Sequence, residues 1–191
     1  MTTNWLPEAL PDRVDVGRLS FVPLTPALVV PDYAAVMRDV AMLRAWSGED
    51  WPTADFPIEL NHADLVRHDR EQVERVALTY SILLDEIVQG CIYVWPLVQS
   101  LGGRSIEVPP DALLPADDVV VRGWLHDAPA LELVRSVVGW LTAPPFTFPR
   151  LWWQTNTQCP EQLSACDALG LVDELAFAGV DRRWVLRSRP H

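Results

Sequence analysis

The sequence contains no lysine, so each of its 15 basic residues is an arginine, and 26 aspartate and glutamate residues bring the formal net charge to −11. Proteins that bind nucleic acids or anionic membranes need clustered positive charge to displace counterions. The charge balance therefore excludes both kinds of binding as the main activity. An anionic ligand would have to be held by backbone dipoles or by a few arginines.

Cysteine is scarce as well. The three cysteines, Cys91, Cys159 and Cys166, are odd in number and contain no CxxC pair. A disulfide framework uses an even number of cysteines, and a zinc knuckle uses closely spaced pairs. The sequence therefore predicts no disulfide framework and no metal site.

Long hydrophobic runs are also missing. The most apolar stretch, residues 87–101, is interrupted by Gln89, Gly90, Pro96 and Gln99, and a membrane-spanning helix needs about 20 predominantly apolar residues. Residues 1–15 lack the basic and then apolar pattern of a signal peptide. We therefore expect a cytoplasmic protein with no membrane segment.

Proline and tryptophan are abundant, with 17 and nine residues in a chain of 191 that is 49% apolar and 21% charged. This length and composition are typical of one globular domain that buries a sizeable core. Most prolines fall between the elements predicted below. We predict a lead-in over residues 1–18 and a single domain over residues 19–191.

The first part of the chain predicts one strand and two helices. Residues 19–22, Leu-Ser-Phe-Val, predict a short strand that ends at Pro23. Apolar residues at three- and four-residue steps predict one amphipathic helix over residues 32–46. A second helix is predicted from Asn61, as its N-cap, to about Val76, with a largely solvated surface.

The rest of the chain alternates strands with helices. A hairpin over residues 77–95 turns at Asp85-Glu86, and the segment 98–117 is predicted as a loop. The remaining predicted elements are a strand at 118–125, a helix at 129–141, a strand at 148–155, a helix at 160–169 and a hairpin over 172–187. Early hairpins and later helix-linked strands predict an α/β fold, with a mixed sheet covered by helices on both faces.

This order of elements resembles the GCN5-related N-acetyltransferase (GNAT) superfamily. The run Phe21-Val22-Pro23-Leu24-Thr25 is similar to the family's first strand entering its first helix, and LWWQTN followed by SACDALGL is similar to its fifth strand and fourth helix. The runs NHADLVRH, LTYSILLDE and GCIYVWP resemble a bacterial GNAT-like subgroup. The resemblance implies a mostly antiparallel sheet of about seven strands, acetyl-CoA as the cofactor and a small-molecule amine as the acceptor.

The family's pyrophosphate loop, of the form Q/R-x-x-G-x-G/A, is absent from the matching junction at residues 122–131. Such a loop holds phosphates with its backbone amides and the positive end of the next helix. Here we expect Asp127 to cap the helix and compete with a phosphate, and Pro129 removes a further donor. The segment Gln99–Arg104 is an alternative match, but prolines follow it where a helix should start.

The resemblance also implies site residues. His126, at the end of the fourth family strand, is the expected general base. Cys166 stands where the family usually has the Tyr that acts as general acid. The alternative is that Cys166 is a small buried hydrophobe. Asn156 matches a residue that contacts the pantetheine, with a strand-ending turn as the alternative. The expected cofactor-binding residues are Gly123, Trp124, Leu125, Ala130, Leu131 and Asn156.

Three functional hypotheses follow. The first is an acetyl-CoA-dependent N-acetyltransferase in which the amine attacks the thioester directly. The second is a catalytically degenerate GNAT-like module that binds a ligand or a protein, with Trp46, Trp51, Trp95 and Trp124 lining a cleft or an association surface. The third is a subunit that acts only within a homodimer, through a sheet edge or the Trp51-Pro52 loop.

Overall fold

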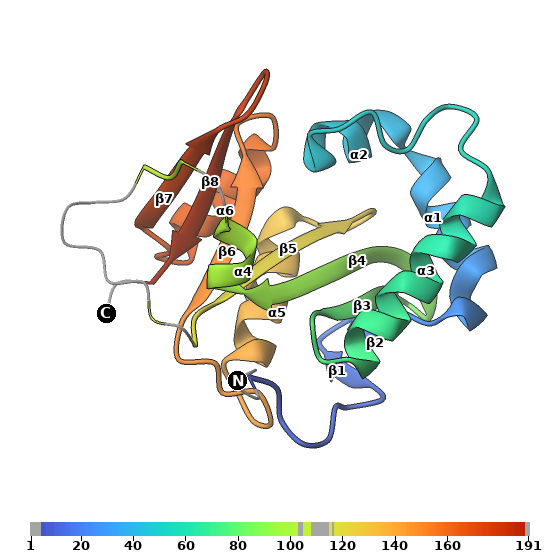
Figure 1. Cartoon of the computed structure of the whole chain (residues 1–191), viewed down its shortest axis with the longest axis horizontal. Coiled ribbons are helices and arrows are strands. Elements are labelled where there is room, and N and C mark those ends of the chain that lie inside the picture. The colour runs from blue at the N-terminus through green and yellow to red at the C-terminus, as the bar shows by residue number, and fades with distance from the viewer. Residues whose placement is uncertain (1–4, 103–104, 108–114, 116, 190–191) are drawn as a thin grey trace. The chain divides into compact units, whose positions relative to one another are not determined.

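The computed structural model describes residues 5–102, 105–107, 115 and 117–189. Its eight strands form one sheet in the order β1-β2-β3-β4-β5-β6-β8-β7 (Figure 1). The pair β5 and β6 is parallel, whereas β1–β2, β2–β3, β6–β8 and β7–β8 are antiparallel. The predicted class, a mixed and mostly antiparallel α/β sheet, is confirmed. None of the described helices is long and apolar enough to cross a bilayer.

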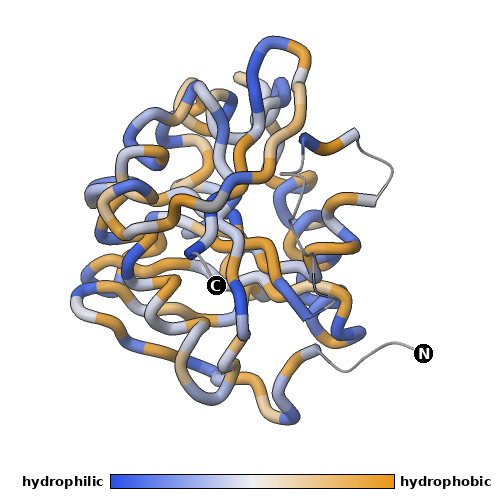
Figure 2. Tube along the Cα trace, turned by 90° about the vertical axis from the view of Figure 1, so that its left-hand side faces the viewer, coloured by the Kyte–Doolittle hydropathy of each residue, from blue (hydrophilic) through white to orange (hydrophobic). Residues whose placement is uncertain are grey.

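The described chain divides into two compact units. The N-terminal unit comprises residues 8–93 and 123–128, and the C-terminal unit comprises residues 5–7, 94–122 and 129–189 as far as these are described. The boundaries fall inside β4 and inside β5. Polar and apolar stretches alternate along the trace (Figure 2), as expected for amphipathic elements.

The strands of the N-terminal unit are β1 (Val14–Val16), β2 (Leu19–Pro23), β3 (Leu78–Leu84) and most of β4 (Ile87–Pro96). β1 lies within the predicted lead-in and was not expected, because three residues are too few to show a period. The β3–β4 hairpin is confirmed. Its turn residues Asp85 and Glu86 have φ values of 50° and 65°, the backbone of a tight two-residue hairpin turn.

The helices of this unit are η1 (Pro26–Leu28), α1 (Val29–Arg38), α2 (Val40–Ser47) and α3 (Ile58–Val73). The single helix predicted over residues 32–46 is therefore wrong. The chain breaks at Asp39, whose φ is −142° and whose carboxylate accepts a hydrogen bond from the Met42 amide at 2.9 Å. This local bond offers the backbone an alternative to continuing the helix.

Asn61 is not the N-cap that the sequence predicts, because α3 begins one turn earlier after Pro57. Asn61 is instead buried, at 2% exposed, and its Nδ2 donates to Oδ2 of the buried Asp32 at 2.8 Å. Helices α1 and α3 lie side by side in Figure 1. The bond between Asp32 and Asn61 therefore joins these two helices.

The C-terminal unit confirms the predicted alternation of strands and helices, with small shifts at the ends. Its elements are α4 (Leu97–Leu101), most of β5 (Val119–Leu125), α5 (Ala130–Leu141), β6 (Leu151–Asn156), α6 (Pro160–Ala168), β7 (Asp173–Ala178) and β8 (Arg183–Ser188). α4 falls at the edge of a segment predicted as a loop. Its apolar residues Leu97 and Leu101 are one turn apart, and both are buried.

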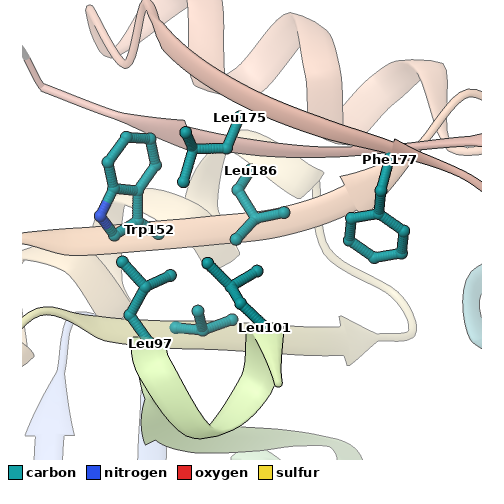
Figure 3. Close-up of a cluster of buried hydrophobic side chains, with 7 residues drawn as sticks. Leu97, Leu101, Trp152, Leu175, Phe177 and Leu186 are labelled. Carbon is teal, nitrogen blue, oxygen red and sulfur yellow. The ribbon is translucent and has the colours of Figure 1, made fainter. Parts of the chain in front are cut away.

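One core cluster of this unit lies between α4 and the sheet (Figure 3). Leu97 and Leu101 pack against Trp152 on β6, with Leu186 on β8 and Phe177 on β7 in the same cluster. The neighbouring residue on β6 points the other way by strand alternation. That residue, Trp153, donates from its indole nitrogen to Gln162 of α6 at 3.1 Å.

Candidate functional site

The parallel ladder between β5 and β6 is short. It pairs Val119 with Leu151, Val120 with Trp152 and Val121 with Trp153, although β5 continues to Leu125 and β6 to Asn156. In the described part of the chain these two strands share no later pair. The polypeptide of β5 then passes into the N-terminal unit at Gly123.

The first turn of α5 has no side-chain cap. Its N-cap is Pro129, and no described residue accepts a hydrogen bond from the Ala130 or Leu131 amide. Uncapped amides at the positive end of a helix dipole form a favourable environment for an anionic group. This 12-residue helix therefore keeps the donors that a phosphate requires.

Asp127 does not cap α5, so that prediction is wrong. Its carboxylate pairs with Arg38 of α1, with Nη2 2.9 Å from Oδ1, and the Arg38 Nη1 also donates to Gln89 at 2.7 Å. The φ of Asp127 is 57°, a left-handed conformation that aspartate tolerates better than most residues. Arg38 holds the carboxylate by an interaction that the sequence spacing does not reveal.

The three expected cofactor residues on β5 belong to the N-terminal unit. Gly123 is buried, Leu125 is half-buried, and Trp124 is 1% exposed with its ring 5.4 Å from that of His126, edge to face. The Trp124 side chain is thus part of the packed interior. Any contribution from this residue to cofactor binding would come from its backbone.

His126 is 8% exposed, and its Nε2 lies 3.0 Å from the carbonyl oxygen of Ala35. Because a carbonyl can only accept, Nε2 carries the hydrogen and Nδ1 keeps its lone pair. Burial lowers the pKa of His126 below its ordinary value. A neutral imidazole with no described partner at Nδ1 fulfils the chemical requirement for a general base.

Cys166 is fully buried on α6, and burial raises the pKa of its thiol to about 12. An acid this weak would give up a proton to a departing thiolate only unfavourably, since an ordinary thiol has a pKa of about 8.5. The environment of Cys166 matches the alternative, a small buried hydrophobe. Its acid role stays a prediction.

Asn156 is 0% exposed at the end of β6, and its Oδ1 accepts from the backbone amide of Gln158 at 2.8 Å. This bond is an Asx turn that ends the strand. Asn156 thus has a structural role in the chain, and its contact with a pantetheine stays a prediction.

Of the alternative phosphate segment 99–104, residues 99–101 are helical and residues 103–104 lie outside the described residues.

Sequence reasoning did not bring together Arg122, Gln154 and Trp184 of the C-terminal unit. The Arg122 guanidinium carbon lies 4.7 Å from the centre of the Trp184 ring, and Gln154 is 3% exposed. Period-two alternation along each strand could have placed these residues on one face of the sheet. The missing information was the order of the strands, which puts β8 next to β6.

The chain has the fold of the GCN5-related N-acetyltransferases. It is similar to the ribosomal-protein-S5-alanine acetyltransferase from Vibrio fischeri, with a TM-score of 0.66 and 13% identity over 93% of this chain and 95% of that one. It is also similar to the microcin C7 self-immunity acetyltransferase MccE in complex with acetyl-CoA and AMP, with a TM-score of 0.66 and 8% identity over 95% and 98%.

A third similar structure is the ribosomal L7/L12 α-N-protein acetyltransferase RimL in complex with coenzyme A. Its TM-score is 0.65 at 10% identity, over 93% of this chain and 97% of that one. No family model matches the sequence, and no curated protein matches it. At these identities the similarity establishes the fold.

Proposed function

We propose that this protein is an acetyl-CoA-dependent N-acetyltransferase that acts on an amine. The observation that carries the proposal is the uncapped first turn of α5, directly after the strand that leaves the short parallel ladder. The similar structures support it, because each is named as an acetyltransferase and two of them are complexes with acetyl-CoA or coenzyme A.

The amides of Ala130 and Leu131 are the proposed donors to the cofactor pyrophosphate. Two N–H groups at a helix N-terminus suit an anion in an acidic chain without lysine, since they supply positive potential without a basic side chain. The backbone of Gly123–Leu125 is the proposed contact for the pantetheine. When bound, acetyl-CoA supplies the acetyl group as a reactive thioester.

His126 is the proposed general base. An amine attacks a carbonyl carbon only in its neutral form, and its ammonium form must first lose a proton. The Nδ1 lone pair of His126 can accept that proton, while the bond from Nε2 to the Ala35 carbonyl fixes the tautomer. The same bond stabilises the imidazolium that results.

Calorimetric titration with coenzyme A tests the proposal, and Ala130→Pro is the decisive variant. Proline is accepted at the first helical position, and the extended Pro129 before it, at ψ 142°, is compatible with it. The variant removes one N–H donor, so we expect about tenfold weaker binding. Ala130→Gly keeps the N–H and serves as the control.

Two results would contradict the proposal. If the wild-type protein does not bind coenzyme A at millimolar concentration, acetyl-CoA is not its cofactor. The hypothesis of a degenerate binding module would then be favoured. Equal affinity of wild type and Ala130→Pro would show that the first turn of α5 does not hold the pyrophosphate.

A further inference from the structure

Helix α1 holds the end of β5 at two places within the N-terminal unit. The carbonyl oxygen of Ala35 lies 3.0 Å from Nε2 of His126, and the Arg38 guanidinium donates to the Asp127 carboxylate. Residues three positions apart on a helix are neighbours on its surface. One face of α1 therefore contacts both the proposed base and the residue that follows it.

The contact at Arg38 consists of three hydrogen bonds. Nη2 lies 2.9 Å from Oδ1 of Asp127, and Nη1 donates both to Oδ2 of the same carboxylate and, at 2.7 Å, to Oε1 of Gln89. A guanidinium that binds both oxygens of a carboxylate fixes its direction as well as its distance. Because Gln89 lies on β4, Arg38 links α1, β4 and the turn after β5.

The backbone at Asp127 needs such a restraint. Its φ of 57° is left-handed, a conformation that is unfavourable for a residue with a side chain. Residues in such conformations persist where the surrounding contacts determine them. The backbone amide of His126 donates to the Gln89 carbonyl at 2.9 Å. The turn that carries the imidazole is thus fixed by Gln89 on one side and by Arg38 on the other.

The ion pair is half-exposed, since 44% of the Arg38 side chain and 50% of the Asp127 side chain are accessible to solvent. Exposed pairs contribute little to the stability of a fold. A catalytic group, by contrast, is sensitive to small displacements, because a misplacement of about 1 Å can lower a rate about 100-fold. The contribution of this pair is therefore expected in the geometry of the base rather than in folding.

Charges of both signs lie around the imidazole. Burial, the largest influence, lowers the pKa of His126, and so does the charge of Arg38. The bond to Ala35 and the carboxylates of Asp39 and Asp127 raise it. The two members of the ion pair act on the ring in opposite directions. The intact pair therefore changes the proton affinity of the ring less than either charge alone would.

We propose that Arg38 is a positioning residue for the proposed base, His126. By holding the Asp127 carboxylate, it keeps the imidazole where Nε2 meets the carbonyl of α1 and Nδ1 offers its lone pair to the ammonium group of the acceptor. In that step an N–H bond of the ammonium breaks, an N–H bond forms at Nδ1, and the amine keeps the electron pair. This inference rests on the proposed acetyltransferase function.

Arg38→Lys tests the geometry without changing the charge. Lysine cannot bind both carboxylate oxygens and the Gln89 side chain in one fork. With acetyl-CoA and phenethylamine, we expect kcat to fall about 10- to 100-fold while both KM values change less than about twofold. Arg70→Lys, in the exposed ion pair with Glu74 on α3, is the matched control and should leave kcat unchanged.

The nitrogen-15 resonances of His126 provide a measurement that needs no activity. Assigned with a His126→Gln variant, they report which ring nitrogen carries the hydrogen. The wild type should show the Nε2–H form alone, because the carbonyl of Ala35 can only accept. Arg38→Lys should show a mixture of the two neutral forms, and Arg70→Lys should match the wild type.

The same resonances followed against pH separate positioning from packing. Arg38→Gln leaves the carboxylate beside the imidazole and should raise the pKa of His126, whereas Asp127→Asn leaves the guanidinium and should lower it. The acid limb of kcat/KM should move in the same two directions. A pair that only packs against the histidine would give a raised pKa in both variants, because each would expose the ring.

Three results would overturn the inference. These are a kcat of Arg38→Lys within about twofold of wild type, a pure Nε2–H form in that variant, or pKa changes of the same sign in Arg38→Gln and Asp127→Asn. If the wild type binds no coenzyme A and acetylates no amine, the proposed function fails separately. The tautomer and the pKa of His126 in these variants then decide whether Arg38 positions it.

Discussion

Individual buried polar side chains of the two units have different surroundings. In the N-terminal unit, Asp32 and Asn61 bond to each other and join two helices. In the C-terminal unit, Trp152 donates to Asp118 at 2.8 Å, whereas Gln154, two residues further along the same strand, has no described partner. Bonded pairs of this kind stabilise the fold, whereas Gln154 makes no such bond within the described residues.

The largest expected effect concerns the bonded pair of the C-terminal unit. Trp152→Ala should lower the free energy of unfolding by about 4 kcal/mol, because it empties a large volume next to Leu97 and Leu186 and leaves the Asp118 carboxylate without its indole donor. Chemical denaturation measures this. A loss of less than about 1 kcal/mol would show that Trp152 is not a core residue. The control is Trp5→Ala, which removes a less buried tryptophan.

The bonded pair of the N-terminal unit should respond to pH. Burial raises the pKa of Asp32 from 3.8 to about 6, despite the bond from Asn61. The protonated form is therefore favoured in the folded state, so its contribution to stability is complete below about pH 4 and is lost as the pH rises through about 6. The shift corresponds to about 3 kcal/mol.

Asp32→Asn should remove this dependence, since an amide does not ionise. The measurement is the difference in unfolding free energy between wild type and variant from pH 3.5 to 7.5, with Asp55→Asn, an exposed residue of the same unit, as the control. A difference that stays constant across this range, or that changes with the opposite sign, would contradict the burial of an ionisable Asp32.

The smallest effect concerns the half-exposed ion pair of Arg38 and Asp127. Asp127→Gly should cost less than about 1 kcal/mol of stability, because exposed pairs contribute little and glycine accepts the positive φ. It removes a negative charge three residues before α5, so coenzyme A should bind about threefold more tightly. Arg38→Gln leaves that carboxylate unpaired and should weaken binding. If both variants changed the affinity for coenzyme A equally and in the same direction, the electrostatic explanation would be contradicted.

Periodic patterns predicted much of the fold from the sequence. The β3–β4 hairpin and the β7–β8 hairpin follow from alternation, α5 follows from a helical period, and the end of α6 follows from Gly170, whose φ is 70°. The break between α1 and α2 was missed because it depends on one bond of the Asp39 side chain. α4 was missed because five residues do not establish a period.

The site was less predictable than the fold. Local sequence predicted His126 as a base, a role that stays a prediction, and its tautomer depends on the Ala35 carbonyl, 91 residues away. The predicted role of Asp127 was wrong for the same reason, since its partner Arg38 lies 89 residues away along the chain. Spacing along the chain describes only neighbours on one element, whereas these partners meet through tertiary packing.

Gly90 on β4 has a consequence for the placement of His126. A Cβ at this position would lie 2.2 Å from the carbonyl oxygen of Trp124, closer than any packed structure allows. Beside this close approach, the backbone amide of His126 donates to the Gln89 carbonyl at 2.9 Å, which holds the histidine against β4. The proposed base is thus positioned by the absence of a single methyl group, so even alanine at position 90 would shift the ring that is to accept the proton.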